Sequence, residues 1–136
     1  MFEIKLFTRS CETELFWEKL EQSCLPLKPF DKNIRQFLNA FAKSILLDRS
    51  ARDFPELITL ANYFKSKNLD SFIPEGAQEY VLRARGTVFH LAPSNVDTVF
   101  LYSSLLSLLC GNRCLIRISR NLTAQVGFAL DKINNF

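Results

Sequence analysis

The chain has 136 residues, 48% of them hydrophobic and 13 of them phenylalanine, which is enough for one modest apolar core. We therefore expect one domain, or a piece of one. The formal net charge of +3 is too small by itself to indicate a nucleic acid or a membrane surface as a partner.

The sequence also argues against export and membrane insertion. The first residues, MFEIKLFTRS, carry Glu3 and Lys5 inside an apolar run and do not resemble a signal peptide. The longest nearly uncharged stretch, Val99 to Cys110, is shorter than the about 20 residues of a membrane-spanning helix. We expect a cytoplasmic protein without a membrane span.

Residues 1–82 are predicted to be a mainly helical region. Ser10 would cap a helix from Cys11 to about Ser23, and a linker with two prolines follows at 25–30. Asp31 would then cap the most clearly amphipathic helix of the chain. Its apolar residues recur at helical spacing: Ile34, Phe37, Leu38, Phe41, Ala42, Ile45 and Leu46.

A further helix is predicted from Asp53, its capping residue, to Asn68, with Pro55 close to its first turn. Its inner stripe would comprise Leu57, Ile58, Ala61 and Phe64. Residues 73–76 are predicted to form a turn, and 79–85 either a short extended segment or a last helical turn. For these helices we expect packing and partner contacts rather than catalysis.

Residues 85–119 carry the most informative pattern, which predicts strand, polar turn, buried helix, glycine stop and strand. Thr87 to Ala92 is a short apolar run closed by Pro93, which cannot donate to a β-ladder. Val96 to Cys110 has no wide polar face, so we expect a helix that is buried on most sides.

Polar residues and glycine mark the two ends of this helix. Asn95 and Asp97 offer capping oxygens at its start, and Gly111 with Asn112 ends it. Afterwards 113–119 alternates, with Cys114, Ile116 and Ile118 on one face and Arg113, Leu115, Arg117 and Ser119 on the other. The unit is βαβ, and in open parallel sheets ligands bind beyond the carboxyl ends of the strands. A site is therefore expected at 93–96 and 119–121.

The last segment, 111–136, is basic. Arg113, Arg117, Arg120 and Lys132 stand against Asp131 alone. Such a segment either binds an anion or forms a solvated basic face.

The cysteines do not indicate a metal site. Cys11, Cys24, Cys110 and Cys114 form no C-x-x-C pair and come with a single histidine, His90. We expect Cys110 and Cys114 to be small buried hydrophobic residues, and His90 to be a satisfied core histidine on the strand. Disulfides are not expected in a cytoplasmic protein.

The segment from Arg83 to about Asn121 resembles a known family. Its pattern G-x-V-x-x-x-x-P-x-N, a buried helix, G-N and a strand ending in R-I-S is similar to the first coenzyme-domain segment of the aldehyde dehydrogenase superfamily. The wording resembles the acyl-CoA reductase branch, which includes the long-chain fatty acyl-CoA reductases of bacterial bioluminescence. The resemblance implies an α/β fold in which residues 83–136 form an incomplete βαβα part of a Rossmann coenzyme domain.

The resemblance also implies roles for individual residues. Asn95 matches the asparagine whose amide stabilises the oxyanion as a thioester or hemithioacetal forms; from the residues alone a helix cap is the favoured interpretation. Arg117 matches a lysine that reaches the adenosine ribose. Arg120 stands where many NAD-using members carry a glutamate, which implies NADPH, and Ser119 would add a hydroxyl to the same phosphate.

None of the four cysteines aligns with the catalytic cysteine of the family. The chain therefore resembles the N-terminal part of an NADPH-dependent enzyme that converts a fatty acyl-CoA or acyl thioester to an aldehyde. Alone we expect it to be inactive, and either oligomeric or associated with the missing catalytic half. One alternative is a non-catalytic interaction module left by loss of that half, and another is a member similar to γ-glutamyl phosphate reductase.

Overall fold

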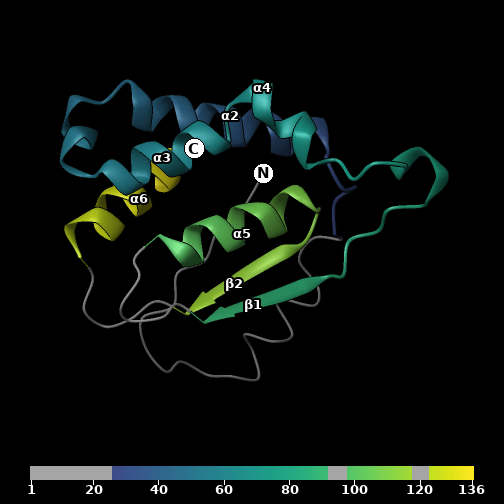
Figure 1. Ribbon diagram of the computed structural model, residues 1–136. Coiled ribbons are helices and arrows are strands. Elements are labelled where there is room, and N and C mark those ends of the chain that lie inside the picture. Colours follow the sequence, from purple (N-terminus) through teal and green to yellow (C-terminus); the bar gives the residue numbers. More distant parts are fainter. Residues whose placement is uncertain (1–25, 92–97, 118–122) are drawn as a thin grey trace, which may run out of the picture.

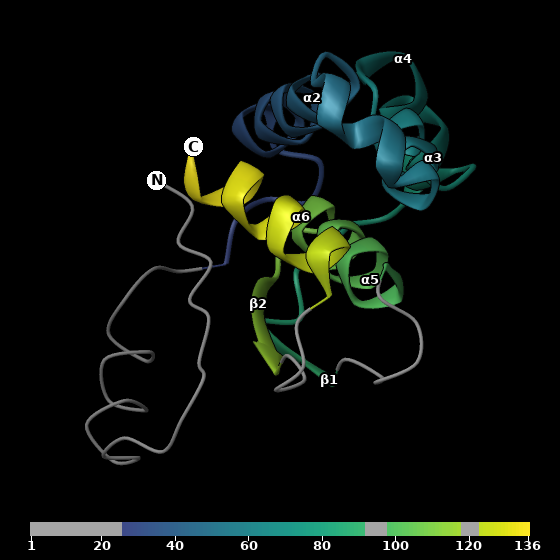
Figure 2. The ribbon, with the colours of Figure 1, turned by 90° about the vertical axis from the view of Figure 1, so that its left-hand side faces the viewer.

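The computed structural model describes residues 26–91, 98–117 and 123–136. Within these ranges a small parallel sheet lies on one side of helix α5, Val99–Leu109, and other helices lie on the opposite side (Figure 1). Figure 2 shows the same order of layers from a second direction. The predicted α/β class is confirmed in this general form. The helix predicted for 11–23 lies outside the described residues.

Helix α2, Lys32–Leu46, forms where the sequence predicts it. The Asp31 carboxylate accepts a hydrogen bond of 2.8 Å from the Asn33 backbone N–H and so caps the first turn. One face of the helix is fully buried at Ile34, Leu38, Phe41, Ala42 and Ile45, and Phe37 and Leu46 are partly buried beside it. Helical spacing alone was sufficient to find this element.

The prediction that Asp53 caps the next helix is wrong. Asp53 is the last residue of a 3-10 helix, η1 (Arg49–Asp53), whose own cap is Asp48, which accepts from the Ser50 backbone N–H at 2.8 Å. Helix α3, Pro55–Tyr63, begins without a side-chain cap bond. The first residue of α3 is Pro55, whose backbone nitrogen carries no hydrogen and therefore requires no hydrogen-bond acceptor.

The far end of the predicted helix also differs. Helix α3 stops at Tyr63 and a separate short helix, α4 (Ser66–Leu69), contains Asn68. The Ser66 backbone N–H donates to Asn39 of α2 at 2.9 Å, and the Asn68 amide donates to the Asn62 carbonyl at 2.7 Å. These bonds replace the helical ones across the break. The predicted inner stripe is confirmed by the burial of Leu57, Ala61 and Phe64, and Ile58 is partly buried. Leu60, which was not predicted, is buried as well.

The segment from α4 to the sheet contains little regular structure. Two short 3-10 helices, η2 (Asp70–Phe72) and η3 (Ala77–Glu79), flank the predicted turn, in which Gly76 has φ +74°. After Glu79 there is neither helix nor strand as far as β1, so the predicted last helical turn does not continue toward Arg85.

The predicted βαβ unit is confirmed within the described residues. Strand β1, Thr87–Leu91, pairs in parallel with β2, Arg113–Arg117. After α5, Gly111 adopts φ +82°, and its N–H and that of Asn112 close the helix end on the carbonyls of Leu108 and Ser107. This is the Schellman arrangement that favours glycine.

The expectation of a single inner face on β2 is only partly met. Ile116 faces α5 and is buried, and half-buried Cys114 lies on the same face. Leu115, on the opposite face, is also buried, although its pairing partner Phe89 is 56% exposed. Both faces of β2 are therefore shielded from water near its middle.

Helix α6, Ala124–Asn134, follows β2 and packs against α2. The Thr123 hydroxyl accepts from the Val126 backbone N–H at 3.3 Å and caps it. One apolar cluster includes residues of α2, α3, α5 and α6, so both regions contribute to the same core. The division at residues 82 and 83 stays a prediction.

Candidate functional site

The two strands end side by side. Leu91 pairs with Arg117, so the carboxyl ends of β1 and β2 lie at one edge, at the left of Figure 1. Helices α5 and α6 begin at the same side, each on the chain that continues from one of these strands. In parallel sheets this edge is where ligands bind.

Arg117 lies at this edge with its side chain exposed. Among the described residues none forms a hydrogen bond or an ion pair with its guanidinium, which is therefore free to bind an anion. The other predicted site residues, Asn95, Ser119 and Arg120, follow the two strand ends in the sequence and lie outside the described residues. Asp97 lies outside them too. Helix α5 begins at Val99 with Thr98 as its N-cap residue, so the predictions that it begins at Val96 and is capped by Asn95 or Asp97 are wrong.

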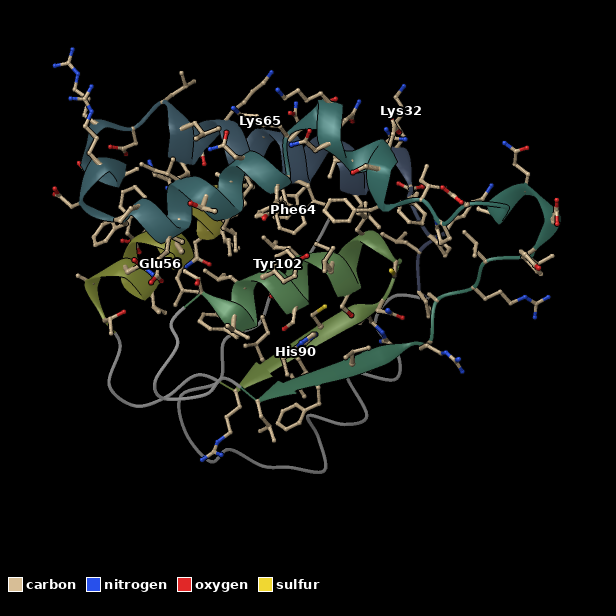
Figure 3. The ribbon with its side chains drawn as sticks, in the orientation of Figure 1. Lys32, Glu56, Phe64, Lys65, His90 and Tyr102 are labelled. Carbon is tan, nitrogen blue, oxygen red and sulfur yellow. The ribbon has the colours of Figure 1, made fainter. Side chains whose placement is uncertain are left out.

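A carboxylate joins the helix starts near this edge. Glu56, in the first turn of α3, accepts hydrogen bonds on one oxygen from the Thr98 hydroxyl at 3.4 Å and from the Gln125 amide at 3.0 Å. Thr98 is the N-cap residue of α5, and Gln125 lies in the first turn of α6. Figure 3 shows Glu56 between α3 and the left end of α5. The negative charge thus lies near the positive ends of the helix dipoles.

His90 lies between β1 and α5 and is half-buried. Its Nδ1 is 3.1 Å from the Ser103 hydroxyl, which in turn donates to the Phe100 carbonyl. Because a hydroxyl has one proton, Nδ1 must carry the proton shared with Ser103, and Nε2 is an acceptor. Nε2 is buried without a hydrogen-bond partner, so the prediction of a satisfied histidine is wrong for this nitrogen. Burial lowers the pKa of His90.

The two cysteines that the structure describes lie away from the carboxyl edge. Cys110 is exposed, contrary to expectation, because it is the C-cap residue where the chain turns off α5. Cys114, the second residue of β2, is half-buried and donates to the Ser104 carbonyl at 3.3 Å. Burial raises the pKa of the Cys114 thiol, which disfavours the reactive thiolate.

Lys132, one of the predicted anion-binding cations, already has a partner. Its ammonium group is 2.5 Å from an Asp48 carboxylate oxygen and lies over the Phe128 ring at 5.1 Å. Hydrogen bonding from Lys132, with a smaller contribution from the Ser50 backbone, lowers the pKa of Asp48. Of the basic residues at the end of the chain, Arg117 is the described one with a free guanidinium at the candidate site.

In the parts of the chain that the structure covers, no three His, Cys, Asp or Glu side chains gather as a metal site requires. None of the helices in these parts is long and apolar enough to cross a membrane.

The described residues define an α/β protein with a pair of parallel strands whose carboxyl ends lie side by side. Residues 28–130 match the family model described as Acyl-CoA reductase (LuxC). Since this match covers most of the sequence, the chain belongs to the acyl-CoA reductase (LuxC) family, as the resemblance predicted. Comparison with curated proteins and with solved structures gave no match.

Sequence reasoning missed the carboxylate junction at Glu56. Its partners are 42 and 69 residues away in the chain. The one local signal was the acidic residue in the first turn after Pro55, a position that favours negative charge on any helix. The sequence therefore located the strand ends but not the contact that joins the helices behind them.

Proposed function

We propose that this protein takes part in the NADPH-dependent reduction of a fatty acyl-CoA, or another acyl thioester, to an aldehyde. The observation that carries the proposal is the exposed guanidinium of Arg117, which lies where the parallel strands of the βαβα unit end. The family of the chain supports the same proposal. We propose that residues 83–136 form part of an aldehyde-dehydrogenase-like coenzyme domain, behind a helical region of residues 1–82.

The residues after β2 suit a phosphorylated nucleotide. Arg117 and Arg120 supply guanidinium groups, and Ser119 supplies a hydroxyl, within four consecutive positions of the chain. A guanidinium fork binds a phosphate through two parallel hydrogen bonds, whereas a carboxylate would repel it. These residues would bind the adenosine ribose and its 2′-phosphate, while NADPH supplies the hydride. This donor set favours NADPH over NADH.

Asn95 would act on the substrate. It follows β1 by four positions, on the connection to α5. Its side-chain amide would donate a hydrogen bond to the substrate oxygen as negative charge develops there. A preorganised donor of this kind contributes about 2.7 to 4 kcal/mol to transition-state stabilisation.

The acyl group would pass through a thioester on a cysteine that this sequence does not include. Cys110 and Cys114 lie toward the other end of β2, and the thiol of Cys114 has a raised pKa. Neither suits a nucleophile for a carbonyl that is held near Asn95. We therefore propose that this chain supplies the oxyanion donor and part of the coenzyme pocket.

The coenzyme proposal is tested with Arg120→Glu in the complete enzyme that we propose, which comprises this chain and the part with the catalytic cysteine. We expect the ratio of the dissociation constants for NADH and NADPH to fall by about tenfold or more, because a charge-assisted pair is replaced by repulsion. Arg49→Glu, which reverses an exposed charge in η1, is the control and should leave the ratio unchanged. An unchanged ratio in Arg120→Glu would refute the preference for NADPH.

The oxyanion proposal is tested with Asn95→Ala. We expect kcat for acyl-CoA reduction to fall by about a hundredfold or more, with little change in the affinity for NADPH. Asn33→Ala, an exposed amide in the first turn of α2, is the matched control. An unchanged kcat in Asn95→Ala would refute the oxyanion role of Asn95.

An interaction module remains the second candidate. Phe89 is 56% and Leu91 is 63% exposed on the sheet face opposite α5, which favours contact with another protein surface. If the purified protein binds neither nucleotide nor acyl-CoA, this alternative replaces the enzyme proposal. Family membership favours an acyl-CoA reductase over a γ-glutamyl phosphate reductase.

A further inference from the structure

We propose that Glu56 is a positioning residue that fixes the starts of α5 and α6 relative to each other at the candidate site. This inference rests on the proposed function, because it concerns where that function places its substrate and coenzyme. The proposed role of Glu56 needs no contact with either ligand. Glu56 would act through the two helix starts that it joins.

The geometry of the contact carries the first step. One carboxylate oxygen of Glu56 accepts from both Thr98 and Gln125, at 3.4 and 3.0 Å. These donors belong to different helices, and Glu56 belongs to a third, α3. Since the atom is shared, neither helix start can move away from α3 without losing its bond to the carboxylate.

The second step concerns the strands. The β-ladder fixes Leu91 beside Arg117, where each strand ends. The chain leaving Leu91 returns at Thr98, and the chain leaving Arg117 returns just before Gln125. The ladder therefore fixes one end of each connection and Glu56 helps to fix the other. Asn95 belongs to the first connection, and Ser119 and Arg120 belong to the second.

The third step is electrostatic. A negative charge near the first turns of α3, α5 and α6 is favoured by their dipoles. None of the cations in the described residues forms an ion pair with Glu56, so helix starts and the two side-chain donors provide its described interactions. A glutamine at this position keeps one oxygen for the same two donors, loses the charge and has an NH2 group in place of the second oxygen.

The test uses the same complete enzyme, this chain together with the part that carries the catalytic cysteine, with Glu56→Ala, Glu56→Gln, Thr98→Val and Gln125→Leu. Glu75→Ala is the matched control, because Glu75 is an exposed acidic residue in the turn before η3 and is not part of the contact with Thr98 and Gln125. Two quantities are measured. The first is hydrogen exchange of the first hydrogen-bonded amides of the two helices, residues 102–104 of α5 and 126–129 of α6. The second is kcat/KM for acyl-CoA reduction together with KM for NADPH.

We expect Glu56→Ala to accelerate exchange in both helix starts and to lower kcat/KM by about tenfold, because small displacements of reacting groups reduce rates strongly. Glu56→Gln should restore most of both. Gln125→Leu should accelerate exchange mainly in α6, Thr98→Val mainly in α5, and adding Gln125→Leu to Glu56→Ala should have little further effect.

Each failure has its own meaning. Unchanged exchange in Glu56→Ala overturns the inference whatever the activity. Faster exchange with unchanged kcat/KM and KM also overturns it, and leaves the proposed function intact. Absence of NADPH binding by the unmodified protein refutes the proposed function itself, and the positioning role falls with it.

Discussion

His90 has an environment that is unusual for a histidine. One ring nitrogen is bonded to Ser103 and the other is buried without a partner. A protonated ring would place its charge beneath α5 with no carboxylate bonded to it among the described residues. Burial therefore keeps the pKa of His90 in the folded chain below its ordinary value of 6.5.

This shift predicts a dependence of stability on pH. Below the unfolded-state pKa the unfolded chain binds a proton at His90 that the folded chain does not, so the free energy of unfolding falls as the pH drops below about 6.5. His90→Asn keeps a donor toward Ser103 and cannot titrate. The free energy of unfolding, measured with urea at several pH values between 7.5 and 5, should therefore depend less steeply on pH in the variant than in the unmodified protein. Equal slopes would mean that His90 titrates normally.

Gly111 is the described glycine at which an added side chain would meet the closest contact. It has φ +82°, and a Cβ atom built there would lie 2.2 Å from the Leu27 carbonyl oxygen. The positive φ angle is strained for any residue with a Cβ atom. The Leu27 backbone cannot move aside easily, because the Leu27 N–H also donates to the Gly111 carbonyl at 2.9 Å.

Gly111→Ala is therefore expected to lower the free energy of unfolding by about 3 kcal/mol, measured by urea denaturation. Gly127→Ala is the control. Gly127 lies within α6 with no atom near the position of a Cβ, so this change should be stabilising by about 0.5 to 1 kcal/mol. Similar effects in the two variants would contradict the steric argument.

At the scale of elements, the starts of α2 and α3 contrast two kinds of helix start. Asp31 makes a cap bond that the sequence predicts, whereas Asp53 makes no cap bond to α3 although its residue type and place suggest one. Asp31→Ala should therefore reduce the free energy of unfolding by about 1 kcal/mol. Asp53→Ala should change it by less than about 0.5 kcal/mol. Thermal denaturation of both variants compares them directly, and a larger loss in Asp53→Ala would reverse the assignment.

Local patterns predicted α2 and the βαβ unit well, because burial at helical spacing and a glycine stop are encoded by neighbouring residues. The break between α3 and α4 was missed because it depends on Asn39, which lies 27 residues before Ser66. For the same reason the sequence indicated the edge where β1 and β2 end but not Glu56. The break between α3 and α4 and the contact at Glu56 both depend on hydrogen bonds between distant residues, which hydrophobic periodicity does not reveal.

On the scale of the whole molecule, one apolar cluster connects the helical region with the βαβα region. Phe41 of α2 and Leu101 of α5 are both almost completely buried in it. The two predicted regions should therefore unfold together rather than one after the other.

Phe41→Ala tests this expectation. Removal of the ring should cost about 3 to 5 kcal/mol, and amide exchange should accelerate in α5 as well as in α2. Leu47→Ala, at an 83% exposed position just after α2, is the control and should have little effect. Acceleration confined to α2 would show that the two regions are independent.

The ion pair between Lys132 and Asp48 joins positions that are 84 residues apart, and the bond from Leu27 to Gly111 joins the chain over a similar span. We expect contacts of this separation to form late in folding, because the entropy of closing a long loop is lost before the contact contributes any stabilisation. During synthesis α2 would leave the ribosome well before the residues that complete its surroundings. Until those residues are synthesised, the apolar face of α2 is not completely buried. We therefore expect chaperones that bind apolar segments to bind this protein during its synthesis.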